Sequence, residues 1–365
     1  MAILLLAGVL GFIGGTGVQA RSPAERPAAT ETRPQLPVRQ DPIEDIPSSP
    51  ILPIEQDALP SSAIERDGSD PAYLTPKPVE PNAIKPEAAP RVSAGPNETT
   101  ATPRIPSALN SIYEDYAEIL SSHVRENGLV DYGDLRRRRL ELKAILMKLD
   151  ELDPNVYQGL PREEQLAFWI NAHTLKTLEI IARNYPIESS WWLRLTWPPS
   201  DIRHIKGIWT DYKFIVMDEE FTLAEVEKRF FRKTFNEPRA FLAITYASRS
   251  SPSLRRRLYR GQDLNRQLDE QVKAFLSGPA GMRIDRRDKV VRFSALFKPS
   301  WRGQEFVRRY GTDKKFKDRD PATRAVLSFL SNYLSRDDVY FLETENYAIK
   351  PMNFDWRLND TARGF

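Results

Sequence analysis

Nucleophilic and acid–base chemistry in this chain would depend on very few side chains. Ser251, directly before Pro252, could serve as a nucleophile. A serine hydroxyl is only weakly acidic, so it requires a general base, and His204 or His173 could provide one. Glu227 could act as an acid or a base in the same reaction. Such a set would support a serine-dependent hydrolase or acyl-transferase.

Each of these side chains also has a structural interpretation. A serine before a proline is a common N-cap of a helix, and we favour this role for Ser251. His173 lies on a polar stripe of its helix, where a solvated or half-buried structural histidine is the commoner case. A glutamate such as Glu227 more often pairs with Lys or Arg than catalyses. Catalysis by Ser251 would need an imidazole nitrogen within about 3–4 Å of its hydroxyl.

The composition excludes several kinds of site. The chain has no cysteine, which rules out disulfides, thiolate catalysis and Cys-ligated metals. Its three histidines leave little room for a multi-histidine metal centre, so we expect no metal and no cofactor. The four arginines at 136–139 splay around a helix at about 100° per residue and form no stripe. We therefore expect no nucleic-acid partner.

A nearly continuous apolar segment over residues 166–181 predicts the central helix of the fold. Apolar side chains cover every direction of this helix, whereas a surface helix would keep one polar face. Asn171 stands in the middle of it. A buried amide without partners costs about 1–3 kcal/mol, so Asn171 must form hydrogen bonds. We expect it to organise the core or to line a binding site.

The segment 187–210 is loop-like and rich in tryptophan. Trp191, Trp192 and Trp209 could form a platform that binds a glycan or a peptide, since exposed aromatic rings stack on sugars and apolar groups. The alternative is a lid over the core, because large aromatic side chains are mostly buried.

The N-terminal sequence predicts that the protein is localised outside the cytoplasm. Residues 2–20 are apolar and small and end in Val18-Gln19-Ala20, which fits a signal-peptidase site. We interpret residues 1–20 as a signal peptide of a periplasmic or secreted protein. The alternative is an uncleaved anchor in the inner membrane, since about 18 residues can span a bilayer. Membrane contact is expected only through this segment.

Residues 21–106 differ in composition from the rest. They hold 18 of the 29 prolines, and Tyr73 is their only aromatic residue. Such a segment cannot bury enough apolar surface to offset its ordering entropy, so we predict a disordered Pro-rich linker. Residues 107–365 carry 44 Lys/Arg against 37 Asp/Glu and are predicted to form one globular domain. Its mild positive charge favours anionic envelope polymers, and a cell-wall glycan or an envelope protein is the partner we consider.

Local signals predict the first elements of this domain. Ser107 can cap a helix that ends near residue 127, and Asp134 can cap a second one over 135–152. Pro161 opens the central helix. Residues 212–222 predict a hairpin, and Thr222 begins a capping box for a helix that ends near residue 231.

The second half alternates short apolar runs with helical patterns. Residues 241–246 predict a buried strand, and Ser251 a new helix. Further helices are predicted near 261–276, 300–310 and 321–334, with a strand pair near 283–293. The fold class is therefore α+β, a mainly helical single domain with a small, mostly antiparallel sheet.

Several of these segments, in this order, resemble one family. The chain is similar to the bacterial and plant family called domain of unknown function 547 over 107–362, and Phe168-Trp-Ile-Asn-Ala172 is the most specific element. The resemblance implies an α+β domain, often exported in bacteria, without a settled activity. The other segments that carry it are Leu129-Val-Asp-Tyr132, Asn184-Tyr-Pro186, Thr222-Leu-Ala-Glu-Val-Glu227, Pro238-Arg239 with Ser250-Ser-Pro252, and Phe354-Asp-Trp-Arg-Leu-Asn359.

The family pattern implies a thiol site that this chain lacks. A cysteine before the proline would open a helix whose dipole stabilises the thiolate, and a histidine would lie nearby. Here Ser251 stands at the cysteine position and Phe241 at the histidine position. The family's Glu-His pair becomes Glu227-Lys228, and His173 follows the central motif in place of a tyrosine. We therefore interpret the protein as a catalytically degenerate binding or scaffold module, with the serine-dependent enzyme as the alternative.

Overall fold

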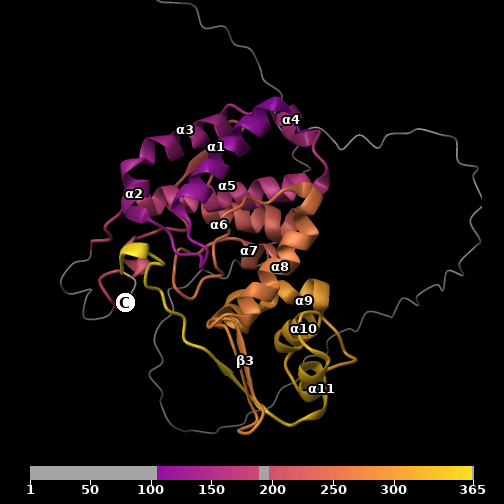
Figure 1. Ribbon diagram of the computed structural model, residues 1–365. Helices are drawn as coiled ribbons and strands as arrows, with labels where there is room; N and C mark the ends of the chain where they lie inside the picture. Colours follow the sequence, from indigo (N-terminus) through magenta and orange to yellow (C-terminus); the bar gives the residue numbers. More distant parts are fainter. Residues whose placement is uncertain (1–104, 189–196, 364–365) are drawn as a thin grey trace, which may run out of the picture. The chain divides into compact units, whose positions relative to one another are not determined.

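Helices dominate the part of the chain that this computed structural model describes, residues 105–188 and 197–363 (Figure 1). Two small sheets accompany them, so the α+β class is confirmed. Among the described residues, no helix combines the length and the apolar character needed to cross a membrane.

Helix α5, Arg162–Arg183, is the central helix, as predicted. Every side chain from Leu166 to Leu178 is buried. The preceding helices lie on one side of α5 and α6 to α8 on the other (Figure 1). The preceding helices are α1 Ser107–His123, α2 Tyr132–Arg137, α3 Arg139–Asp150 and α4 Pro154–Gln158.

The caps of the first helices differ from the prediction. Ser107 is the first residue of α1 and makes no capping hydrogen bond. The helix predicted over 135–152 is divided at Arg138 into α2 and α3, and the capping residue is Asp131, whose Oδ1 accepts the Asp134 N–H at 2.9 Å. Asp131 and Asp134 can both act as an N-cap, so residue types alone do not determine at which of them the helix begins.

The predicted hairpin and capping box are confirmed. Strands β1, Phe214–Val216, and β2, Glu219–Phe221, pair antiparallel. Met217 and Asp218 both have positive φ, which suits a tight turn between such strands. Thr222 and Glu225 cap α6, Leu223–Val226, which continues as a π-helical turn over Glu227–Thr234.

Two predictions around Ser251 are wrong. The predicted strand 241–246 is instead a helical turn, α7, Ala240–Ala243. A short apolar run is compatible with a buried strand or a buried helix. Here the carbonyls of residues 237–239 accept hydrogen bonds from the N–H groups of residues 240–242, which gives a helical turn. No helix begins at Ser251, and the next one is α8, Leu264–Ser277.

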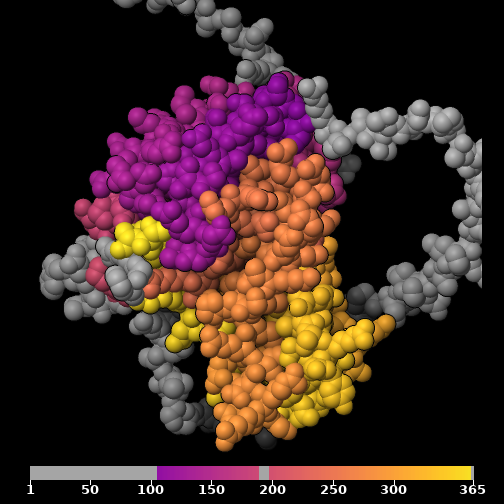
Figure 2. Space-filling view, in the orientation of Figure 1, coloured from indigo at the N-terminus to yellow at the C-terminus, as the bar shows by residue number. Residues whose placement is uncertain are grey.

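The remaining elements form a second group around a three-stranded sheet. Strand β4, Val290–Phe293, lies between antiparallel β3, Met282–Asp285, and parallel β5, Ala348–Pro351. In Figure 2 the purple surface of the N-terminal helices borders the orange surface that includes α8. The helices of this group are α9 Gln304–Tyr310, α10 Pro321–Leu330 and α11 Arg336–Thr344.

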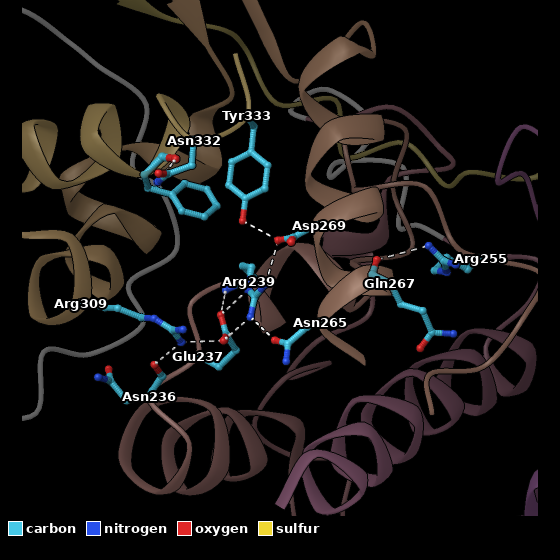
Figure 3. A network of polar contacts seen from close by, with 11 residues as sticks. Asn236, Glu237, Arg239, Arg255, Asn265, Gln267, Asp269, Arg309, Asn332 and Tyr333 are labelled. Atoms are coloured by element: carbon cyan, nitrogen blue, oxygen red, sulfur yellow. Dashed lines mark hydrogen bonds and ion pairs between the residues drawn. The ribbon is translucent and has the colours of Figure 1, made fainter. Parts of the chain in front are cut away.

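A partly buried polar network around the buried Arg239–Glu237 pair joins the two groups. Arg239, at the start of α7, bonds Glu237 through Nε at 2.9 Å and Asp269 of α8 through Nη1 at 2.8 Å (Figure 3). Arg309 of α9 donates to Glu237 at 2.6 Å, and the Tyr333 hydroxyl donates to Asp269 at 2.8 Å. This network therefore fixes α7 and α8 against the C-terminal helices.

Candidate functional site

A surface pocket of about 340 Å³ lies beside Ser251. It is lined by residues 127–129, 248–249, 251–253 and Asn359. Three of the segments that carry the family resemblance meet here, although more than a hundred residues separate each from the next.

The C-terminal segment forms one wall of this pocket. The Arg249 N–H donates to the Arg357 carbonyl at 2.9 Å, and the Val130 N–H donates to the Asn359 carbonyl at 2.9 Å. The Asn359 side chain accepts from the Tyr132 hydroxyl at 2.9 Å and donates to the Gly128 carbonyl at 3.2 Å. The segment around Asn359 is thus held between residues 128–132 and 247–250.

A glycine is required at position 128, next to Ser253 in the pocket wall. Its φ is +79°, and a Cβ there would lie 2.7 Å from the Ser253 Cβ. Only glycine combines this backbone conformation with so close an approach. The Asn127-Gly128 turn can therefore pack directly against Ser253.

Residues 252–261 have little regular structure, and side chains satisfy their backbone. Asn171 of α5 donates to the Tyr259 carbonyl at 2.8 Å and accepts its N–H at 3.0 Å. Glu164 accepts the Gly261 N–H at 2.7 Å. From α8, Gln271 donates to the Ser253 carbonyl at 2.9 Å. The prediction that buried Asn171 must be hydrogen-bonded is confirmed: it holds the chain that leaves the pocket.

The hydroxyl of Ser251 is engaged in the loop itself. Its Oγ accepts the Tyr246 N–H at 2.8 Å and donates to the Pro252 carbonyl at 3.1 Å. The side chain is 8% exposed. It therefore closes a turn and does not cap a helix, which corrects the favoured structural interpretation. After Pro252 the backbone bonds to side chains of α5 and α8, so no helix begins there.

The histidines are engaged elsewhere. His204 Nε2 lies 2.9 Å from the Pro198 carbonyl, and its ring packs against Trp197. His123 Nδ1 lies 3.0 Å from the Ile119 carbonyl. The expectation of a solvated or half-buried His173 is wrong, because this ring is fully buried beside Glu227. Among the described contacts, none joins an imidazole to Ser251.

Glu227 is the centre of a buried charged cluster. Its Oε2 accepts from Arg302 at 2.6 Å, and its Oε1 lies 3.4 Å from His173 Nε2. Burial alone would raise the pKa of Glu227, but the Arg302 guanidinium and then His173 outweigh it and lower the pKa to about 2. Glu227 is therefore a carboxylate with a fixed partner, as its structural interpretation predicted. No local sequence signal points to Arg302, which lies 75 residues from Glu227 along the chain.

Phe241 packs against the arginines of the same cluster. The Arg302 guanidinium lies 4.6 Å from its ring centroid, and that of Arg232 lies 5.7 Å away. Stacking of this kind suits a buried arginine whose charge is already paired. An apolar ring supported by guanidinium groups thus stands where the family pattern implies an imidazole.

Of the three tryptophans predicted to form a platform, the structure describes Trp209. Trp209 is half-buried and packs edge-on against Tyr246, at 5.9 Å between ring centroids. Tyr246 in turn contacts Trp301 at 5.7 Å. Trp191 and Trp192 lie outside the described residues. Trp209 therefore belongs to an aromatic cluster that continues into the core.

Metal-ligating side chains are not grouped at this site. Within residues 105–188 and 197–363, no three His, Asp or Glu side chains lie close enough together to hold an ion. The side chains that face the pocket offer hydroxyl, amide and guanidinium groups. Their chemistry is that of hydrogen bonding to a ligand.

Comparison with known protein families finds a match for the middle part of the chain. A family model described as "Protein of unknown function, DUF547" matches residues 157–276. Residues 157–276 match this family model, as the sequence resemblance predicted. The DUF547 segment includes α5, Glu227, Phe241 and Ser251, and the whole chain has no cysteine. No curated protein and no solved structure matches the chain.

Proposed function

We propose that this protein is an exported, envelope-associated binding module whose Ser251 pocket holds a ligand without cleaving it. One observation carries the proposal: in residues 105–188 and 197–363, no imidazole or carboxylate is hydrogen-bonded to the Ser251 hydroxyl, although Ser251 lines a pocket. Its two hydrogen bonds go to the Tyr246 N–H and the Pro252 carbonyl. A serine nucleophile must pass its proton to a base at hydrogen-bond distance.

The proposal includes the cellular location of the protein. Residues 1–20 act as an export signal or an inner-membrane anchor, 21–106 as a linker, and 107–365 as the binding domain. A linker of 86 residues would have a mean reach of roughly 50 Å if flexible, which suits a domain that searches an envelope polymer. A cell-wall glycan is the first partner to test and an envelope protein the second.

Co-sedimentation with purified cell-wall sacculi tests the binding role. Ser253 is exposed at the rim of the pocket, so Ser253→Trp should obstruct it and leave the protein in the supernatant. Ser277→Trp, at an exposed serine at the end of α8, is the matched control and should sediment like the wild type. If Ser253→Trp sediments as fully as the control, the pocket is not the binding site.

A further inference from the structure

We propose that the outer face of α3 packs against the same face of a second copy of this chain, which gives a symmetric dimer of two antiparallel α3 helices. The inner face of α3 is already covered, since Leu142, Ile145 and Leu149 are buried in the core. The opposite face carries Leu140, which is 71% exposed, and Met147, which is 53% exposed. Large apolar side chains therefore occupy both faces of this helix.

The two exposed side chains form a line along α3. Seven residues correspond to almost two turns of helix, so Leu140 and Met147 point in nearly the same direction, with the exposed Ala144 between them. Single exposed apolar residues are normal, but apolar residues at this spacing form the seam along which one helix packs on another. The small Ala144 would let the second helix approach closely. Figure 1 shows α3 at the outer edge of the helices that the structure describes.

The charges beside this seam select a second copy of the same helix. One flank begins with Lys143 and ends with Asp150, and the other begins with Glu141 and ends with Lys148. In an antiparallel pair each flank meets itself in reverse, so a positive end meets a negative end on both sides. A parallel pair would instead bring Lys143 towards Lys148 of the second copy. The charge pattern therefore favours the antiparallel dimer.

Lys143 and Asp150 are the charges most available for such a contact. Glu141 and Lys148 already form ion pairs within their own copy, at 2.8 and 2.6 Å. Lys143 is exposed and Asp150 half-buried, and neither makes an ion pair with any residue that the structure describes. Two symmetric Lys143–Asp150 pairs would thus be gained between the copies without breaking a pair within either one.

The expected dimer is weak. One helix face per copy is smaller than the standard stable interface of about 1,600 Å², so we expect a dissociation constant on the order of 10–100 µM. None of the residues that line the Ser251 pocket belongs to α3. A dimer would therefore carry two pockets, and a polymeric ligand could be held at two points.

Sedimentation equilibrium of the full chain at about 10–500 µM tests the inference. The average mass of the wild type should rise with concentration towards that of two chains. Leu140→Ser should weaken the association at least about tenfold, because it removes an apolar side chain of the seam from both copies. Tyr340→Ser is the matched control, since Tyr340 is 69% exposed on α11, and this variant should associate like the wild type.

Charge reversal tests the antiparallel arrangement. Lys143→Glu and Asp150→Lys should each weaken the dimer about three- to tenfold, because each brings like charges together twice. The double variant should associate like the wild type, since the pair is restored with its signs exchanged. Lys273→Glu, at an exposed lysine of α8, is the control and should leave the association unchanged.

Several results would overturn the dimer. They are a wild type that stays monomeric over the whole concentration range, association that persists undiminished in Leu140→Ser, and a double variant that associates no better than Lys143→Glu. Vesicles of phosphatidylcholine with phosphatidylglycerol test the other occupant of such a face. If a monomeric wild type pellets with them and Leu140→Ser does not, α3 contacts an anionic membrane instead. None of these outcomes decides whether the Ser251 pocket binds sacculi, which Ser253→Trp tests separately.

Discussion

Two buried polar side chains hold the surroundings of Ser251 in different ways. Asn171 pairs with both polar groups of the Tyr259 peptide, as a neighbouring strand would. Glu227 neutralises Arg302, which packs on Phe241 and Tyr246. Asn171 supplies hydrogen bonds to a backbone segment that belongs to no helix or sheet. Glu227 supplies the carboxylate that pairs with a buried guanidinium group. Replacing either side chain should lower the free energy of unfolding, although neither side chain lines the pocket.

Asn171→Ala should destabilise the protein by about 3 kcal/mol, because two buried hydrogen bonds are lost and the Tyr259 peptide is left unsatisfied. The measurement is the free energy of unfolding in urea. Asn332→Ala is the control, since the exposed Asn332 amide donates to the carbonyls of Ser328 and Phe329 in the preceding helix α10. Equal losses in the two variants would contradict the structural role of Asn171.

Glu227→Gln should cost about 3–5 kcal/mol, because the buried Arg302 guanidinium loses the carboxylate to which it is hydrogen-bonded. The double variant Glu227→Gln with Arg302→Met should recover part of this loss, since it removes the unpaired charge. Urea unfolding of the three proteins checks the coupling. Additive effects would show that the pair does not interact as described.

At the scale of elements, the pocket depends on irregular chain more than on helices. Residues 252–261 are held by side chains of α5 and α8, and the turn at Gly128 packs directly against Ser253 of this segment. Because these segments make few backbone bonds to each other, their positions depend on a small number of side chains.

Gly128→Ala should destabilise the protein by about 1–3 kcal/mol and weaken ligand binding, because the new Cβ combines a positive φ with contact to Ser253. Gly133→Ala is the control: the nearest atom to its Cβ lies 3.6 Å away, and alanine favours the helical conformation of α2. Thermal unfolding of both variants checks the difference. A neutral Gly128→Ala would contradict the close approach across the pocket.

Elements with local signals were predicted well from the sequence, and those decided by distant contacts were not. The burial of α5, the hairpin at 214–221 and the Thr222 capping box follow from nearby residues. The run 241–246 and the chain after Ser251 were predicted wrongly, because turn bonds and the side chains of α5 and α8 decide their conformation. The pairing of Asn359 with Tyr132 spans 227 residues, so no local signal could reveal it.

For the whole molecule, the site depends on the C-terminal segment as much as on the DUF547 segment. Residues 129–132 and Asn359 lie outside the matched range of 157–276, but they line or support the pocket. The Arg239 network also joins α7 and α8 to the C-terminal helices (Figure 3). Folding and binding should therefore respond together to acid.

Acid should destabilise the protein through Glu227. Its pKa is about 2 in the folded state against an ordinary value of 4.5, so its contribution is complete above about pH 4.5 and is lost as the pH falls towards 2. That contribution is on the order of 3 kcal/mol. Glu237, whose pKa is also lowered, adds a loss of the same sign. Urea unfolding at several pH values should show a shallower acid dependence in Glu227→Gln than in the wild type.

The central claim, that Ser251 lies in a binding pocket without acting as a nucleophile, is tested most directly by a serine-reactive fluorophosphonate and intact mass. The hydroxyl is held between the Tyr246 N–H and the Pro252 carbonyl, and no described histidine contacts it. The account predicts no adduct on the full chain, and identical spectra for the wild type and Ser251→Ala. One stoichiometric adduct on Ser251 that disappears in Ser251→Ala would contradict it and restore the serine-dependent enzyme.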